Sequence, residues 1–91
     1  MIRILFVDDE LNVLEGLQRL LRPMRKEWEI ENVESGAAAL DLLAQSEFDV
    51  VVSDVKMPEM DGVELLSEVR TRFPSVVRIA LSGHSDRQSI I

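Results

Sequence analysis

The feature that most constrains this chain is a set of short, nearly continuous apolar runs separated by segments of helical periodicity. Three of these runs have the length of a strand and occupy residues 3–8, 49–54 and 76–82. Runs of this kind are typical of strands that are buried on both faces of a sheet. A more polar run over 29–34 predicts a fourth, exposed strand.

The segments between these strands place apolar residues at helical spacing. They predict helices over 10–24, 37–45 and 63–72, and a further helix that begins within 85–91. Pro23 is expected to end or kink the first helix. The resulting alternation of strands and helices implies a parallel sheet covered by helices on both faces, which is a doubly wound α/β fold.

Composition narrows the class of partner. The formal net charge is −7, and a protein this acidic is poorly suited to bind the phosphate backbone of a nucleic acid directly. The chain has no cysteine, so it holds no disulfide and no thiolate metal site. No apolar run approaches the roughly 20 residues that cross a bilayer. Residues 1–7 are too few for a signal peptide, and we therefore expect a cytoplasmic protein without a membrane partner.

Basic residues gather near the end of the first predicted helix, where cations complement the helix dipole. They are Arg19, Arg22, Arg25 and Lys26. We interpret them as a solvated face of the helix.

Acidic and hydroxyl residues stand where the apolar runs end. The first run ends in Asp8 and Asp9, the next in Asp54 and the last in Ser82. Ligands of an open parallel sheet bind at the carboxyl ends of its strands, so these groups would converge if the strands are neighbours. Converging carboxylates repel one another unless a cation lies among them, and Mg²⁺ prefers oxygen ligands. A carboxylate beside such an ion can attack phosphorus, and Ser82 could donate a hydrogen bond to a phosphoryl oxygen.

Each of these residues also has a simpler interpretation. Asp8 or Asp9 could cap the first helix, Asp54 and Ser82 could be turn residues, and Lys56 could be a solvated loop lysine. The chemical interpretation is favoured because all of them occur together at one edge of the same predicted sheet.

Three segments resemble the receiver domains of bacterial two-component response regulators. They are ILFVDDE over 4–10, DVVVSDVKMPEMDG over 49–62 and IALSG over 79–83. The resemblance covers the whole chain in order and at the right spacing, and it is most specific around Asp54. It implies a flavodoxin-like sheet of strand order 2-1-3-4-5.

The resemblance also implies roles for individual residues. Asp54 would accept a phosphoryl group from the phosphohistidine of a sensor histidine kinase. Mg²⁺ would be bound by Asp9 directly, by Asp8 through water, by Asp54 and by the backbone carbonyl of Lys56. Ser82 would be the switch hydroxyl that moves toward the phosphoryl group.

Further family positions would tune this chemistry. Lys56 and His84 would set the lifetime of the phosphoryl group, and we do not take His84 to be a relay site. Pro58 and Gly62 would shape the loop after Asp54. Such a domain promotes its own phosphorylation and dephosphorylation, and it is not a turnover enzyme.

The sequence departs from the family at its end. A complete receiver has a fifth strand, which carries a lysine and an aromatic switch residue, and a fifth helix. We expect residues 1–91 to be an incomplete receiver domain that ends within the fourth helix, with an output domain beyond residue 91. The fourth strand, with Val77, Ile79 and Leu81, would then be an open apolar edge through which chains could self-associate.

Three other functions are alternatives, and the residues argue against the second and the third of them. A receiver-like interaction or oligomerisation domain without phosphoryl exchange in this truncated form is one of them. A Mg²⁺-dependent phosphohydrolase usually carries a second aspartate two residues after its nucleophile, and Lys56 stands there. A flavin-binding domain of similar topology would need a Ser, Thr and Gly-rich loop after the first strand, which this chain lacks.

Overall fold

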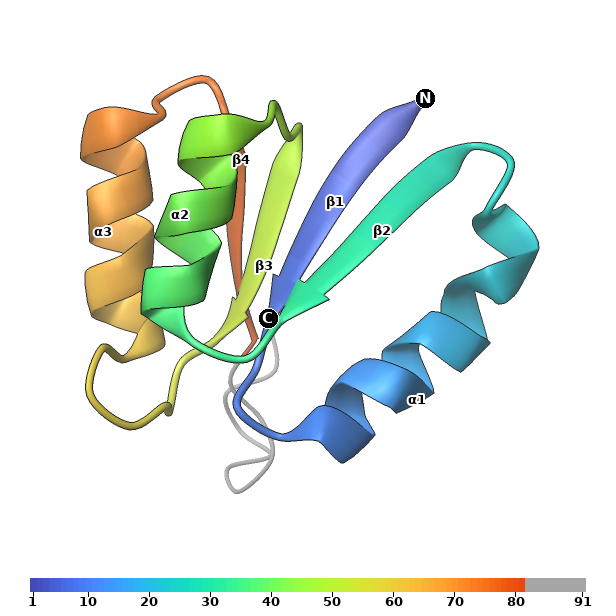
Figure 1. Cartoon of the computed structure of the whole chain (residues 1–91), viewed down its shortest axis with the longest axis horizontal. Helices are drawn as coiled ribbons and strands as arrows, with labels where there is room; N and C mark the ends of the chain where they lie inside the picture. The colour runs from blue at the N-terminus through green and yellow to red at the C-terminus, as the bar shows by residue number, and fades with distance from the viewer. Residues whose placement is uncertain (82–91) are drawn as a thin grey trace.

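The computed structural model describes residues 1–81 of the chain, and Figure 1 shows its helices and strands. In chain order these are β1 (Ile2–Val7), α1 (Leu11–Leu21), the 3-10 helix η1 (Arg22–Met24), β2 (Trp28–Val33), α2 (Gly36–Gln45), β3 (Val50–Asp54), α3 (Gly62–Arg72) and β4 (Val77–Leu81). Each element expected within this range is present. The expected fourth helix lies outside the described residues.

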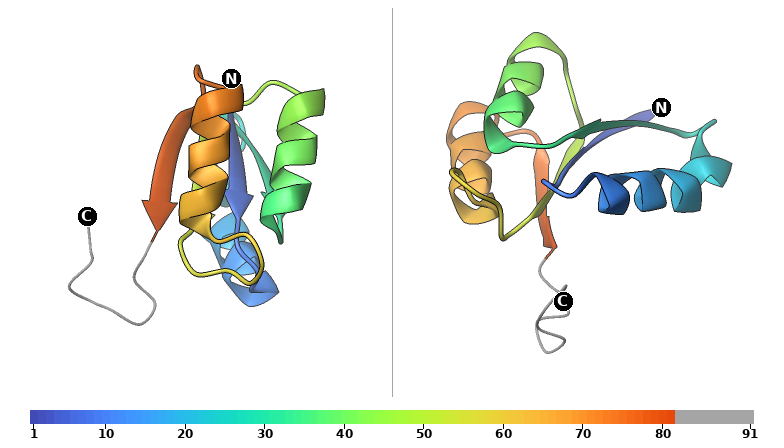
Figure 2. Two further views of the ribbon diagram at one scale, coloured as in Figure 1. Left: turned by 90° about the vertical axis from the view of Figure 1, so that its left-hand side faces the viewer. Right: turned by 60° about the horizontal axis from the view of Figure 1, so that its bottom comes forward.

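The four strands form one parallel sheet of order β2-β1-β3-β4. α1 covers one face of this sheet, and α2 and α3 lie together on the other face, as the right-hand view of Figure 2 shows. The connection from β1 to β2 therefore lies on one face of the sheet, and the connections from β2 to β3 and from β3 to β4 lie on the other. This arrangement confirms the doubly wound α/β fold and the flavodoxin-like strand order over the four strands described.

Two clusters of apolar side chains fix the strands against the helices. The larger cluster lies between the sheet and the α2–α3 pair, and its fully buried side chains include Leu5, Val51, Leu65 and Val69. The smaller cluster lies under α1 and consists of Ile4, Phe6, Leu14 and Val52. Because β1 and β3 are buried on both faces, their ends have fixed positions. Asp8, Asp9 and Asp54 stand at these ends.

α1 packs through a narrower stripe than its leucine content suggests. Leu14 is its only buried residue, with Leu17 and Leu21 partly buried beside it. Leu20 has the same apolar character but is 72% exposed. A helix turns by about 100° per residue, so Leu20 points away from the stripe that contains Leu14 and Leu21.

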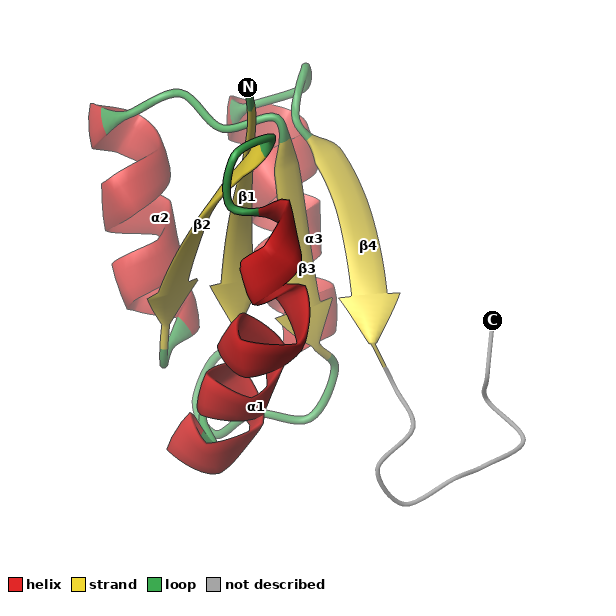
Figure 3. Ribbon diagram, turned by 90° about the vertical axis from the view of Figure 1, so that its right-hand side faces the viewer, coloured by secondary structure: helices red, strands yellow, loops and turns green. Residues whose placement is uncertain are grey.

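β4 departs from the buried strand expected over 76–82. All five of its residues are exposed, including Val77 at 57%. The register pairs Val77 with Val50 and Ile79 with Val52, so the apolar side chains of β4 face the α1 side of the sheet. Figure 3 shows β4 at the sheet edge, with α1 lying across the strands beside it. Among residues 1–81 nothing covers β4 on that side, which is why an apolar strand is exposed here.

No helix within residues 1–81 is long and apolar enough to cross a membrane.

Candidate metal site at the strand ends

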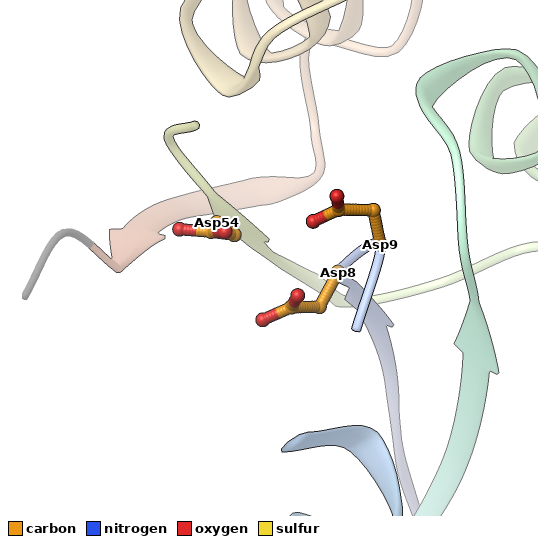
Figure 4. A group of neighbouring side chains, drawn as sticks. All are labelled: Asp8, Asp9 and Asp54. Atoms are coloured by element: carbon orange, nitrogen blue, oxygen red, sulfur yellow. The ribbon is translucent and has the colours of Figure 1, made fainter. Parts of the chain in front are cut away.

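Three carboxylates meet where β1 and β3 end. Asp54 is the last residue of β3, and Asp8 and Asp9 directly follow β1. One oxygen from each of the three side chains lies within 4.8 Å of the other two. Figure 4 shows the three side chains gathered at this edge. β1 and β3 are adjacent and parallel, so the predicted convergence is confirmed for the three carboxylates.

Asp8 is the buried member of the cluster, with 8% of its surface exposed. One of its carboxylate oxygens accepts a hydrogen bond from the backbone N–H of Glu10 at 2.9 Å. Burial raises the pKa of Asp8, and the negative charges of Asp54, Asp9 and Glu10 raise it further, while the Glu10 N–H opposes the rise. The surroundings of Asp8 thus disfavour the ionised form of its carboxyl group.

The alternative in which Asp8 or Asp9 caps the first helix is not realised. Glu10 is the N-cap residue of α1, and no side chain makes a cap hydrogen bond there. Asp9 is exposed and directed into the cluster, as Figure 4 shows, and it is available to an ion.

The spacing of the three oxygens fits a small divalent cation with water among its ligands. Bonds of about 2.1 Å in octahedral geometry place ligand oxygens between about 3.0 and 4.2 Å apart. The observed limit of 4.8 Å is slightly wider. A modest side-chain rotation or one water-bridged carboxylate closes the difference, and an ion would also offset the mutual repulsion of the three charges. The cluster could therefore hold a metal ion.

The backbone after Asp54 is held by a close contact that only glycine permits. A Cβ atom at Gly62 would overlap the carbonyl oxygen of Asp54 and would lie 2.8 Å from the Cα of Val55. The N–H of Gly62 also donates a hydrogen bond to the carbonyl of Val55 at 2.8 Å. Gly62 therefore ties the start of α3 to the end of β3, in agreement with its expected role in shaping this loop.

Ser53 is a feature of the site that sequence reasoning missed. Its side chain is fully buried, and its hydroxyl donates a hydrogen bond to the carbonyl of Asp54 at 2.9 Å. On the next peptide, the N–H of Val55 donates to the carbonyl of Leu81 at 3.1 Å. The available signal was a hydroxyl residue inside an otherwise apolar run.

The loop between β3 and α3 is fixed at its far end as well. Asp61 caps α3 through a reciprocal pair of hydrogen bonds with Glu64, of 2.9 and 3.3 Å, and the D-x-x-E pattern in the sequence could have indicated this. Met60 packs so closely on Gly36 that a Cβ there would lie 2.7 Å from its sulfur. Glu59 takes a left-handed backbone conformation with φ of 65°.

The remaining predicted residues are placed as follows. Lys56 is exposed in the loop that follows Asp54, and Pro58 lies in the same loop. Ser82 and His84 lie outside the described residues, so their proximity to the cluster stays a prediction.

The fold and the acidic cluster define a doubly wound α/β protein with a candidate metal site at its strand ends, and comparison with known proteins identifies the family. The family model for the response regulator receiver domain matches residues 4–91. The chain belongs to this family, whose members act in two-component signal transduction.

Curated and solved relatives agree with this assignment. The chain is 40% identical over 88 residues to the hydrogenase transcriptional regulatory protein HoxA of Cupriavidus necator, covering 97% of this chain and 18% of that protein. The signal receiver domain of an HD domain-containing protein from Pseudomonas fluorescens Pf-5 matches with a TM-score of 0.86 at 37% identity, over 96% of this chain and 68% of that one. The chain thus spans about a fifth of the length of its curated relative.

A third relative has been solved in two complexes. The response regulator TrrA of Thermotoga maritima is 34% identical and has a TM-score of 0.83 both in complex with the histidine kinase ThkA and in complex with Mg²⁺–BeF. These matches cover 100% and 99% of this chain, and 77% of the TrrA chain in each case.

Proposed function

We propose that this chain is a phosphoacceptor module in which Asp54 receives a phosphoryl group from a sensor histidine kinase with the help of Mg²⁺. The observation that carries the proposal is that three carboxylate oxygens, from Asp8, Asp9 and Asp54, lie within 4.8 Å of one another at the ends of β1 and β3. The complexes of TrrA with a kinase and with Mg²⁺–BeF support it, because that relative shares the fold.

The proposed reaction transfers one phosphoryl group. An oxygen of Asp54 attacks phosphorus, an O–P bond forms, the N–P bond of the phosphohistidine breaks, and the imidazole leaves. A bound Mg²⁺ would offset the negative charge on the phosphoryl oxygens. Asp9, which is exposed, would bind the ion directly, and Asp8, which is buried and bonded to Glu10, would act through water.

The rest of the chain orients the acceptor. Ser53 and Gly62 hold the carbonyl and the following peptide of Asp54, so its carboxylate projects from a fixed backbone. The backbone carbonyl of Lys56 as a metal ligand, and Ser82 as the switch hydroxyl, belong to this proposal by family resemblance. Lys56 and His84 as lifetime-tuning residues belong to it on the same ground.

The proposal also covers the setting of the module. Its partners would be a sensor histidine kinase and an output domain beyond residue 91, with no direct nucleic-acid partner. The longer curated relative, a transcriptional regulatory protein, supports an output domain. We further propose that the chain promotes its own phosphorylation without being a turnover enzyme, and that it acts in the cytoplasm.

A direct test uses a small phosphodonor. The chain is incubated with Mg²⁺ and acetyl phosphate, and intact mass is measured before and after chelation of the metal. We expect one added phosphoryl group that requires Mg²⁺ and disappears in the Asp54→Asn variant. Asp41→Asn, a matched change on the exposed face of α2, should be labelled normally. Labelling that survives Asp54→Asn would reject the assignment of the acceptor.

A second candidate function is an interaction or oligomerisation domain without phosphoryl exchange. It is favoured by one observation, which is that every residue of β4 is exposed and three of its apolar side chains share one face. Self-association through this edge would appear in sedimentation velocity as a larger species whose fraction rises with protein concentration. The Ile79→Lys variant should lack this species. A single monomeric species across a wide concentration range would contradict it.

A further inference from the structure

A groove lies at the opposite end of the sheet from the acidic cluster. It forms where the end of α1, the 3-10 helix η1 and the start of β2 meet, and Figure 1 shows these three segments together. Its volume is about 270 Å³, and its lining consists of Gln18, Leu21, Arg22, Arg25, Trp28 and Ile30. The strands are parallel, so the first residue of β2 is a full strand length away from the edge that carries Asp8. The groove is therefore separate from the proposed phosphoacceptor site.

The groove has an apolar floor and a basic rim. Leu21, Trp28 and Ile30 are half-buried and pack against the smaller core cluster, so they form a supported surface. Arg22 and Arg25 are exposed beside them. A supported indole next to guanidinium groups can bind an apolar side chain and carboxylates at the same time.

The cations at the rim have no acidic partner in the described part of the chain. Within residues 1–81, ion pairs join Arg3 to Glu29 and Glu31, and Arg72 to Glu68, and none involves Arg22 or Arg25. This is notable because the chain has 17 acidic residues and only 10 basic ones.

Strand geometry keeps the acidic residues of β2 out of the groove lining. Side chains alternate between the two faces of β2, so Trp28 and Ile30 face α1 while Glu29 faces the other side. There Glu29 pairs with Arg3 at 3.4 Å. The acidic residue nearest to the groove along β2 is thus directed away from it and already engaged.

We propose that this groove is a docking site for an acidic peptide segment of a partner protein. Carboxylates of the segment pair with Arg22 and Arg25, and one apolar side chain packs on Trp28. Charge complementarity selects the partner, because two unpaired cations border a surface without a carboxylate. A nucleic acid is disfavoured by the net charge of −7 of the whole chain. The site is independent of Asp54, so docking and phosphorylation can occur together.

Trp28 provides the readout, because it is the only tryptophan in the chain. The probe is a synthetic peptide with one leucine flanked by glutamates, titrated at low salt while Trp28 emission is recorded. Two matched peptides replace the leucine by serine or the glutamates by glutamines. We expect a saturable change in emission with the first peptide and markedly weaker binding with each of the others.

Variants separate this groove from general surface charge. The double variant Arg22→Gln with Arg25→Gln should bind about tenfold more weakly, since each exposed ion pair is worth up to about fivefold in affinity. Arg70 is an exposed cation on α3 that forms no ion pair among residues 1–81, and the Arg70→Gln variant should bind as the parent does. Circular dichroism confirms that each variant is folded.

Three outcomes would overturn the inference. One is the absence of any saturable change in Trp28 emission. Another is equal affinity of the double variant and the Arg70→Gln control. The third is tighter binding of duplex DNA than of the acidic peptide, which would assign the groove to nucleic acid instead.

Discussion

Replacing Asp8 by asparagine should stabilise the protein when divalent cations are absent. The change removes one of three clustered negative charges and keeps an oxygen that can accept the hydrogen bond from Glu10 at 2.9 Å. One oxygen of Asp8 lies within 4.8 Å of one oxygen of Asp9 and of one oxygen of Asp54. At that distance a pair of like charges costs about 0.9 kcal/mol in water and about 3.5 kcal/mol at an effective dielectric constant of 20.

The lower figure applies here because Asp9 is exposed and Asp54 is half-buried. Two such pairs give a gain of about 2 kcal/mol in the free energy of unfolding. Urea unfolding, followed by circular dichroism at neutral pH in EDTA, measures this gain. Mg²⁺ should stabilise the parent chain by binding to its folded state and should stabilise the Asp8→Asn variant less. Asp41→Asn on α2 is the matched control and should change neither quantity.

The gain should depend on pH in a definite direction. The pKa of Asp8 is raised in the folded protein, first by burial and then by its acidic neighbours. The folded state therefore binds this proton more tightly than the unfolded state, and the parent chain recovers the lost stability as the pH falls through the raised pKa toward the ordinary value of 3.8. The advantage of Asp8→Asn is largest at neutral pH and shrinks on acidification. A variant less stable than the parent in EDTA, or a difference that does not change with pH, would refute this reasoning.

Substitutions at three positions that support the site, each paired with a control substitution, are tested by urea unfolding. Gly62→Ala should destabilise by about 2 kcal/mol through overlap with the end of β3, whereas Gly16→Ala, which meets nothing within 4 Å, should stabilise α1 by about 0.5–1 kcal/mol. Equal effects would contradict the close contact at Gly62. Asp61→Ala should cost about 1 kcal/mol by removing the α3 cap, and Asp61→Asn much less. Ser53→Val should cost about 1 kcal/mol and Ser53→Thr less, and a reversed order would contradict the role of the hydroxyl.

The sequence predicted the acidic cluster because that prediction needs only strand order and strand ends. Apolar runs that end in Asp8, Asp9 and Asp54 identify parallel strands, and neighbouring parallel strands bring their ends to one edge. The cap of α2 is local in the same way, since the hydroxyl of Ser35 accepts a hydrogen bond from the N–H of Ala38 at 3.1 Å. Such features are local or follow directly from topology.

Features that depend on what packs against an element could not be predicted in the same way. The apolar run of β4 indicates which side chains share a face, but not whether another element covers that face. Leu20 fits the helical spacing in isolation and is exposed because the stripe under α1 is narrow. The contacts of Gly62 with Asp54 and of Gly36 with Met60 join separate segments, and no local pattern encodes them.

The proposed phosphoryl transfer to Asp54 requires one shared ion at the ends of β1 and β3. Mn²⁺, which prefers the same oxygen ligands as Mg²⁺, can be titrated into the chain while backbone amide signals are recorded by NMR. We predict that the signals of Asp8, Asp9 and Asp54 broaden first and together, and that excess Mg²⁺ restores them. Broadening that begins instead among other acidic residues, such as Glu29 and Glu31 on β2, would contradict the shared site.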